Sequence, residues 1–567
     1  MTAGLNVLYV NVPSVPASEV RAHFGGTPSF NYLSMPTGLL YVAAQARAEG
    51  WVRTEHLLDL NAELFKYRSG RWAGPLQTSF ECFQTTLAQT VSFTPAVIAF
   101  SISFTSSHDT FVESAAILRA RWPHAIIVAG GHHATSCTFQ LLDHSVVDYV
   151  VRGEGEQVFS QLLKGLATGA PITLPGVYTR ANRPADPKDL RIGPFVDDLD
   201  TLPDPAWDLL DMEVYMTSGA NKTKRLGQDG GALETRVVTF SSSRGCPFSC
   251  TFCASHQVHG RKMRYLSTAR VIAMMDALRA RYRANVFFPD DDLFTANKAR
   301  TKELLGRFRE TFPDCEIQAP GGLSVNTLDF ELLDLFIATG TKVLTLAVES
   351  GSEHVQQYII KKRCNLKKAL GLVRYLRDRD VIVRCYFILG FPDESLEQMR
   401  ETVDYAYELM PDWSGIAVAI PLPGSEIFDE FRALGVLNDD LSRWGSNFDA
   451  LRDFDTPLAR ADEIRNLAYD ANLYLNFFAN PNLREGRYER AIELFRDIVA
   501  AHPFHVVGLY CIAECLEHTN RAQEAAAIRA HIVDLIHSDS RARQMHLRNQ
   551  AKMPKIREQP AFPEPTP

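Results

Sequence analysis

The sequence predicts an α/β protein in three parts: an open parallel-sheet domain, a barrel of six βα units and an all-helical end. Short apolar runs alternate with helical periodicity up to about residue 165 and again from about 235 to 440. After about residue 455 the apolar periodicity is helical throughout. Strands that alternate with helices predict parallel sheets covered on both faces. A length of 567 residues also exceeds what one core accommodates.

Residues 1–190 have the pattern of a Rossmann-like domain. The helix expected over 35–51 separates two of its strands, and Gly50 suits the end of that helix. Ligands of such sheets lie at the carboxyl ends of the strands. Residues 191–230 are acidic and Pro-rich, then Gly-rich, which predicts a linker. The expected strands are 5–13, 56–60, 96–103, 125–131 and 147–156.

Residues 231–450 repeat the alternation of strand and helix. Six βα units in this length predict a partial (β/α)6 barrel of the TIM type. The expected strands are 235–245, 284–292, 316–324, 341–351, 381–392 and 414–424.

Residues 451–550 predict a helical domain. Gly486 and Asn520, Tyr488 and Ala522, Ala491 and Ala525, and Leu494 and Ile528 pair at a spacing of 34 residues. This spacing is typical of tetratricopeptide repeats, and a plain helical cap is the alternative. Residues 551–567 are Pro-rich, and we expect them to be disordered.

The composition disfavours several classes of protein. The net charge of −8 and a pI of about 6.1 disfavour a nucleic-acid-binding protein. No apolar run approaches the ~20 residues that span a bilayer, and the first residues lack the basic start of a signal peptide. The ten cysteines are scattered rather than arranged as a disulfide framework, so we expect a cytoplasmic protein.

Three cysteines, Cys246, Cys250 and Cys253, lie together directly after a predicted strand. Their spacing brings three thiolates to one side of a tight loop, as an iron–sulfur cluster requires. Three thiolates for four irons leave one iron open to a substrate. The alternatives are a zinc site completed by His256 or His259, since structural zinc takes four ligands, and a chance grouping of buried thiols.

The motif Cys246, Cys250, Phe252, Cys253 resembles the radical S-adenosylmethionine (SAM) family, over about residues 232–440. The resemblance implies a [4Fe–4S] cluster whose fourth iron binds SAM. One electron then cleaves SAM to a 5′-deoxyadenosyl radical, which abstracts hydrogen from an unactivated carbon. It also implies an external one-electron reductant of the flavodoxin or ferredoxin type and an anaerobic reaction.

Further stretches match motifs of that family at strand ends. By resemblance, Phe252 lies against the adenine of SAM, and Asp291 and Asp292 contact its amino group. This chain has acids where many relatives have Gly-Gly-Glu, and a helix N-cap is the alternative role for them. Glu349 matches a carboxylate near the ribose or amino group. Gly390 lies in the motif whose backbone meets adenine, since glycine permits close approach.

The amino-terminal region resembles the cobalamin-binding domain that precedes many radical SAM domains, over about residues 5–165. The resemblance rests on a Gly-Gly after a predicted strand, together with residues 36–44, 102–107 and 147–156. The contact residues that it implies for cobalamin are Ser103, Thr105, Gly130, Gly131, Gly153 and Glu154. The alternative is a flavodoxin-like sheet that holds no cofactor.

The sequence has no Asp-x-His-x-x-Gly, the motif that supplies a histidine to cobalt in another cobalamin class. We therefore expect no histidine ligand, and we assign His108, His132 and His133 to hydrogen bonding or the surface. The remaining cysteines, among them Cys385, Cys511 and Cys515, are expected to be small core residues.

The resemblance implies a cobalamin-dependent methyltransferase that adds methyl to an unactivated carbon of a small molecule. An oxidative cyclase or rearrangement enzyme, like the anaerobic cyclases of tetrapyrrole synthesis, is the alternative within this class. A non-catalytic helical-repeat protein is the alternative from another class, with a protein partner at the carboxy-terminal helices. A methylthiotransferase-like RNA modifier is disfavoured, because it needs three further grouped cysteines. No motif in the sequence identifies the substrate.

Overall fold

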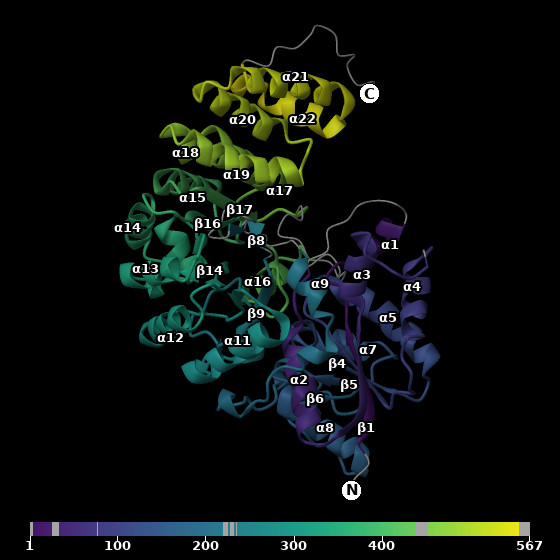
Figure 1. Cartoon of the computed structure of the whole chain (residues 1–567). Helices are drawn as coiled ribbons and strands as arrows, with labels where there is room; N and C mark the ends of the chain where they lie inside the picture. Colours follow the sequence, from purple (N-terminus) through teal and green to yellow (C-terminus); the bar gives the residue numbers. More distant parts are fainter. Residues whose placement is uncertain are drawn as a thin grey trace.

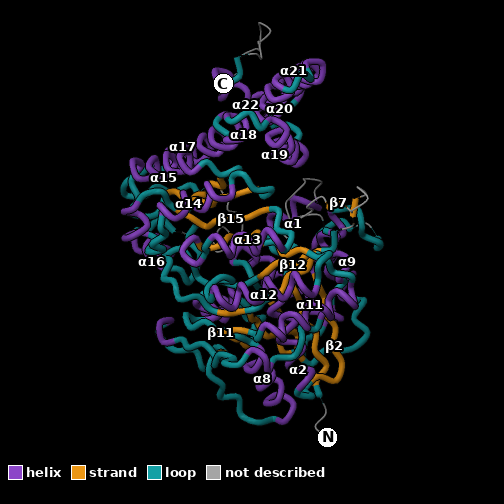
Figure 2. The backbone as a smooth tube through the Cα atoms, turned by 60° about the vertical axis from the view of Figure 1, so that its left-hand side comes forward, coloured by secondary structure: helices purple, strands orange, loops and turns teal. Residues whose placement is uncertain are grey.

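The computed structural model describes residues 4–24, 33–75, 77–218, 225–226, 232–233, 235–437 and 452–554. Figure 1 shows the amino-terminal sheet domain beside the barrel, with the carboxy-terminal helices beyond the barrel. In Figure 2, turned by 60°, these helices still stand at the end of the molecule away from the amino-terminal domain. The mixed α/β architecture expected from the sequence is confirmed.

Six strands form the amino-terminal sheet, in the order β2-β1-β3-β4-β5-β6. β1 to β5 are parallel, and β6 pairs antiparallel with β5 at the edge. The strands are β1 (Leu5–Asn11), β2 (Val52–Asp59), β3 (Val97–Ser101), β4 (Ile126–Gly130), β5 (Tyr149–Val151) and β6 (Val177–Tyr178). The helices are α1 (Ala17–Phe24), α2 (Thr37–Ala48), α3 (Leu60–Arg68), α4 (Phe80–Ala88), α5 (His108–Arg121), α6 (His132–Ser136), α7 (Thr138–Asp143) and α8 (Glu156–Thr168), with a short 3-10 helix, η1 (Thr105–Ser107).

Alternate residues of the central strand β1 enter two different cores. Val7 and Tyr9 pack with α2 and α8, whereas Leu8 and Val10 pack with α4 and α5 on the other face. This is why the strand is a continuous apolar run in the sequence, since both of its faces are covered. The edge strand β6 was not predicted, because only two residues pair there.

The segment predicted as a linker is packed where the structure describes it. Val196, Leu199, Trp207 and Leu210 are buried in the core that also holds barrel strands and helices. The segment therefore fixes the sheet domain against the barrel. It contains the helices η3 (Leu199–Thr201), η4 (Trp207–Leu209) and α9 (Met212–Thr217), and η2 (Pro187–Asp189) lies just before it. Part of the segment, 219–224 and 227–230, lies outside the described residues.

The barrel is built from two parallel sheets, β13-β12-β9 and β14-β15-β16-β17. The strands are β9 (Val237–Phe240), β12 (Val286–Pro289), β13 (Glu316–Ile317), β14 (Ala319–Ser324), β15 (Val343–Glu349), β16 (Ile382–Leu389) and β17 (Trp413–Val418). Two short pairs are β7 (Arg225–Leu226) with β8 (Ala232–Leu233), and β10 (Ser243–Arg244) with β11 (Arg264–Tyr265). All six expected barrel strands are present, with the third divided into β13 and β14.

The barrel helices begin at side chains that cap their first turn. Ser267, Asn297, Asp329, Asn365 and Ser425 each accept a hydrogen bond from the backbone N–H three residues ahead, which satisfies a donor that the helix leaves free. The helices are α10 (His256–His259), α11 (Thr268–Tyr282), α12 (Lys298–Thr311), α13 (Phe330–Ala338), α14 (Leu366–Leu376), α15 (Leu396–Leu409) and α16 (Glu426–Ala433), with the short turns η5 (Val325–Thr327) and η6 (Val355–Ile359).

The carboxy-terminal region is helical, as expected. Gly486 and Asn520, which stand 34 residues apart, both have left-handed backbones (φ 75° and 59°) just before helices that start at Tyr488 and Ala522. The two hairpins are thus equivalent in geometry, and the tetratricopeptide assignment stays a prediction. The helices are α17 (Ala461–Leu473), η8 (Tyr474–Phe478), α18 (Pro481–Arg484), α19 (Tyr488–Ala501), α20 (Val506–His518), α21 (Ala522–Ser538), α22 (Ser540–Asn549) and η9 (Gln550–Lys552).

Asparagines of the carboxy-terminal region bind the free edge of β17. The Asn476 amide accepts from the Ser414 N–H (2.7 Å) and donates to the Ser414 carbonyl (2.7 Å). Asn472 makes the same pair of bonds with Ile416 (3.1 and 2.7 Å). The helix therefore satisfies the backbone groups that a further barrel strand would otherwise pair.

We predict that Asn476→Ala destabilises the protein by about 1–3 kcal/mol, because it leaves a buried N–H and a buried carbonyl unpaired. Urea denaturation followed by circular dichroism measures the loss. Asn466→Ala is the matched control on the same helix, since Asn466 is exposed and contacts only Arg548 among the interactions of the described residues. Equal midpoints for the two variants would contradict this role.

Candidate functional site

The three cysteines of the motif lie on the loop between β10 and α10. Cys246, Cys250 and Cys253 are free and partly exposed. Gly245 precedes them with φ 90°, and a Cβ there would stand 2.5 Å from the Lys262 carbonyl. Glycine is thus required for the loop to turn back on itself.

The thiols lie near one another and near Lys362. The pKa of Cys250 is raised to about 12, chiefly by burial; Lys362 opposes this rise, and Cys253 and Cys246 contribute to it. Burial also raises the pKa of Cys246. Removal from water makes thiolates costly in the free protein, and binding to a cationic metal centre offsets that cost.

Carboxylates at the end of β12 hold the start of the cysteine loop. Asp291 Oδ1 accepts from the Ser242 N–H (3.0 Å), the Ser242 hydroxyl (3.1 Å) and the Ser243 hydroxyl (2.6 Å). Asp292 accepts from the Gly245 N–H (3.1 Å). The two acids expected to contact SAM are therefore bonded to the loop itself. Asp291 Oδ2 has no hydrogen-bond partner, and burial raises the pKa of Asp291 to about 6.

Glu349 ends β15 in a strained conformation. Its φ is 74°, in a region that residues other than glycine seldom adopt, and it lies at a register shift against β16. Its carboxylate pairs with Lys362 at 2.7 Å, and both side chains are largely buried. Burial opposes the charge on Lys362, but Glu349 outweighs it and the pKa of Lys362 is raised.

Gly390 follows β16 with φ 86°. Its N–H donates to Glu394 (2.6 Å), and its carbonyl accepts from Arg452, which comes from the segment before α17. The Phe391 ring lies 6.0 Å from the ring of Phe252 in the cysteine loop. The strand end and the cysteine loop are therefore adjacent, as the sequence motifs predict.

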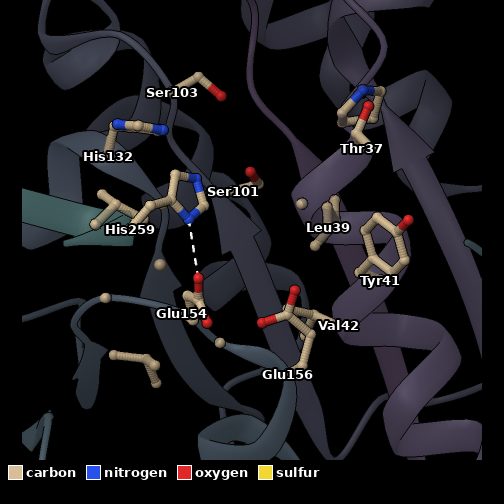
Figure 3. Close-up of a pocket in the computed structure, with 18 of the residues that line it drawn as sticks. Thr37, Leu39, Tyr41, Val42, Ser101, Ser103, His132, Glu154, Glu156 and His259 are labelled. Carbon is tan, nitrogen blue, oxygen red and sulfur yellow. Dashed lines mark hydrogen bonds and ion pairs between the residues drawn. The ribbon is translucent and has the colours of Figure 1, made fainter. Parts of the chain in front are cut away.

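A cavity of about 510 Å³ lies between the sheet domain and the barrel. Ser103, Gly130, Gly131 and Gly153 line it from the carboxyl ends of the sheet strands, and Asp290, Asp291 and Asp292 line it from the barrel. Figure 3 shows Tyr41 and Val42 of α2 opposite His132 and His259 across this space. Of the predicted cobalamin contacts, Thr105 is outside the described lining, because it turns to His133 (Oγ1 to Nδ1, 3.2 Å).

A buried ionic cluster joins the two domains beside this cavity. Glu154 receives both terminal nitrogens of Arg264 (2.8 and 2.7 Å) and Nδ1 of His259 (3.0 Å; Figure 3). Glu156 pairs with Arg244 at 2.6 Å. Burial raises the pKa of Glu154, but hydrogen bonds from His259 and Arg264 outweigh it, and the pKa lies well below its usual range.

The histidines of the sheet domain have two different environments. His133 Nε2 lies 2.9 Å from His108 Nδ1, and His108 Nε2 lies 3.1 Å from His144 Nε2. Both ring nitrogens of His133 are thus engaged. The His132 ring lines the cavity, 5.9 Å from the ring of His259.

The described residues hold no group of three His, Cys, Asp or Glu side chains placed to bind one metal ion. His256 Nε2 lies 3.2 Å from the Gln257 amide nitrogen. A mononuclear zinc site requires converging Cys and His side chains, and this part of the chain does not show them.

Several residues of the site were not predicted from the sequence. Arg244, Arg264 and His259 hold the glutamates of the sheet domain, Lys362 holds Glu349, and Arg452 reaches the Gly390 carbonyl. A weak indication was available for Arg244 and His259, which flank the cysteines. Lys362 and Arg452 lie outside every motif, and only the fold brings them here.

Comparisons with known proteins agree with this geometry. Residues 240–406 match the radical SAM superfamily model, and residues 28–163 match the B12 binding domain model. The chain is 29% identical over 376 residues to cytidylyl-2-hydroxyethylphosphonate methyltransferase of Streptomyces wedmorensis, covering 62% of this chain and 69% of that one. It is 26% identical to the anaerobic magnesium-protoporphyrin IX monomethyl ester cyclase of Cereibacter sphaeroides, over 55% of this chain and 49% of the cyclase.

A solved structure shares the fold along almost the whole chain. It is that of the cobalamin-dependent SAM radical enzyme OxsB with aqua-cobalamin and SAM bound. The TM-score is 0.60 at 13% identity, covering 98% of this chain and 82% of OxsB.

The chain is an enzyme that joins a cobalamin-binding domain to a radical SAM barrel. Its two domains are those of cobalamin-dependent radical SAM enzymes, and its cofactors are a [4Fe–4S] cluster, SAM and cobalamin. The residues present fit these groups. Three partly exposed thiols share one loop. Glu156 and Asp291 line the cavity, and each keeps one buried carboxylate oxygen without a hydrogen-bond partner among the described residues, which a polar ligand could satisfy.

We predict that Glu154→Gln destabilises the protein by about 3–5 kcal/mol, because it leaves the buried Arg264 without its counter-charge. Urea denaturation measures this loss. Glu426→Gln is the control, since Glu426 pairs with Lys361 at the surface, where such pairs contribute about 1 kcal/mol or less. An equal loss of unfolding free energy in the two variants would contradict a larger contribution from the buried Glu154–Arg264 pair.

We predict a second, pH-dependent effect at Glu394. Burial raises the pKa of Glu394 from 4.5 to about 8, against the opposing Phe391 and Gly390 N–H groups. The folded chain then binds the proton more tightly than the unfolded chain, so this contribution to stability is lost as the pH rises from about 4.5 to 8. Glu394→Gln should flatten the fall in urea midpoint over this range. Glu397→Gln, at an exposed position in the first turn of α15 just after Glu394, should leave the fall unchanged.

Proposed function

We propose that the protein is a methyltransferase that transfers a methyl group to an unactivated carbon of a small molecule. The observation that carries the proposal is the cavity between the two cofactor domains, which is lined by the cobalamin-domain strand ends and by the barrel segment that holds the cysteine loop. One relative, 29% identical over 62% of this chain and 69% of its own, is named a methyltransferase. When bound, the cluster with SAM supplies a 5′-deoxyadenosyl radical, and cobalamin supplies the methyl group.

The residues of this chain would hold these groups as follows. Cys246, Cys250 and Cys253 would bind three irons. Phe252, Glu349 and Gly390 would contact SAM, together with Asp291 and Asp292 at the end of β12. Ser103, Thr105, Gly130, Gly131, Gly153 and Glu154 are assigned to the cobalamin side, where Glu154 positions His259 and Arg264 rather than standing free.

Closure of the domain interface keeps water away from the reacting groups. Glu154, Arg244 and Arg264 are buried between the domains and paired with one another. A radical that abstracts hydrogen from unactivated carbon also reacts with other C–H groups that it meets. A closed interface limits such side reactions.

We further propose a cytoplasmic protein that works anaerobically and takes single electrons from a flavodoxin- or ferredoxin-type donor. Among the described residues, no helix is long and apolar enough to cross a membrane. The carboxy-terminal helices bind the edge of β17 through Asn472 and Asn476, so this part of their surface is not open to a protein partner.

The cyclase alternative is retained as an outcome of one experiment. Full-length protein, reconstituted with its cluster and cobalamin, is incubated with deuteromethyl-SAM, dithionite and small-molecule extract. Methyl transfer predicts one S-adenosylhomocysteine and one 5′-deoxyadenosine per product, and a product that retains three deuterons. A cyclase predicts 5′-deoxyadenosine without S-adenosylhomocysteine, and that result would overturn the proposal.

We predict that the variant with alanine at 246, 250 and 253 loses iron and forms at least 100-fold less 5′-deoxyadenosine. Iron analysis and chromatography measure the two effects. Cys82→Ala, which removes an exposed thiol on α4, is the control and should retain both. Iron retained at wild-type levels in the triple variant would contradict the cluster assignment.

A further inference from the structure

Three polar side chains inside the barrel, Arg384, Thr345 and Thr239, have buried atoms without a hydrogen-bond partner among the described residues. In β16 the residues Val383, Cys385, Phe387 and Leu389 pack with the outer helices. Strand alternation therefore turns Arg384, Tyr386 and Ile388 to the inside. The same argument places Thr345 of β15 and Thr239 of β9 inside, because their neighbours Leu344, Leu346, Val238 and Phe240 belong to the outer core.

Arg384 is a cation without a counter-charge. Its Nε is buried without a hydrogen-bond partner, and among the described residues its guanidinium has no ion pair and no aromatic ring beneath it. Its neighbours in register are Thr345 and Trp413. Thr345 Oγ1 is likewise buried and unpaired, as is Thr239 Oγ1. Buried polar groups cost free energy when they are unpaired, and an anionic ligand would remove that cost.

Tyr386 lies one inward position above Arg384, and small residues surround its ring. A Cβ on Gly415 of β17 would stand 2.9 Å from Tyr386 Cδ1, and a Cβ on Gly322 of β14 would stand 3.6 Å from Cδ2. Ala347 is its partner on β15. The ring therefore occupies space that side chains of the neighbouring strands leave open. The side chain remains 37% exposed.

The next inward residue connects this column to the cysteine loop. Ile388 packs in the small cluster that contains Phe252 and Phe391. Four residues of strand separate Arg384 from Ile388, which corresponds to about 13 Å. A molecule held at Arg384 would thus extend past Tyr386 towards the cysteine loop.

We propose that the barrel binds a small molecule that carries an oxyanion, a carboxylate or a phosphate, next to a flat ring. Arg384 pairs with the oxyanion, because a guanidinium matches its geometry with two parallel hydrogen bonds. Tyr386 stacks on the ring, and Thr345 and Thr239 donate to the remaining polar atoms. The assignment rests on the proposed function only in placing the reacting carbon at the end nearest the cysteine loop.

Isothermal titration calorimetry of full-length, reconstituted protein tests the site with four probes: benzoate, phenyl phosphate, benzyl alcohol and acetate. We expect one of the two ring anions to bind most tightly, which identifies the oxyanion, and benzyl alcohol to bind at least tenfold more weakly. Arg384→Met should weaken the ring anion at least tenfold, and Arg384→Lys less. Tyr386→Leu should weaken the ring anion severalfold but leave acetate unchanged.

Arg374→Met is the matched control, because Arg374 is exposed on the outer helix α14. Thermal melts establish that each variant is folded, and Arg384→Lys keeps the charge if Arg384→Met does not fold. The site is overturned if the ring anions bind Arg384→Met as tightly as wild type, if benzyl alcohol binds equally well, or if no probe gives heat. The calorimetry measures binding and does not require turnover. If the protein fails to transfer methyl, the binding result still tests this site separately.

Discussion

The arrangement of the molecule depends on one buried carboxylate. Glu154 comes from the strand-end loop of the cobalamin domain and binds Arg264 and His259 of the barrel. A buried charge of this kind is tolerated only when its partners are in place, so the two domains have one favourable relative position. His259 ends α10, directly after the cysteine loop, and Arg264 lies in β11, which pairs with β10 directly before the loop. The same contact therefore fixes where that loop stands relative to the cobalamin domain.

The sequence predicted those features that depend on local pattern. Apolar runs predicted the strands, and helical periodicity predicted the helices between them. The cysteine motif gave the loop, and family matches agree with the cofactors. It did not predict Lys362 beside Glu349 or Arg452 on Gly390, because pairs so distant in the chain leave no periodicity. The inward direction of Arg384 also became visible only when the register of β15, β16 and β17 was known.

Charged groups in this structure have two different functions. Asp291 and Asp292 are bonded to the loop that they flank, so they shape it before any ligand arrives. Arg384 has no such bond within the described part of the chain, and we propose that a ligand supplies its partner. Glu349 lies between these cases, since it is paired with Lys362 and its backbone is held in a strained conformation. Preorganised groups suit a cofactor site, and unsatisfied groups suit a substrate that comes and goes.

The asparagines on the edge of β17 constrain how this chain can change its length. Four residues of α-helix advance about 6 Å, close to the rise of about 6.6 Å for two residues of strand. Asn472, Asn476 and Asn480 therefore meet Ile416, Ser414 and Asp412 in step. One inserted residue in α17 would rotate the row by about 100° and detach it from the strand. The junction between the barrel and the helices therefore cannot change length by one residue without losing these hydrogen bonds.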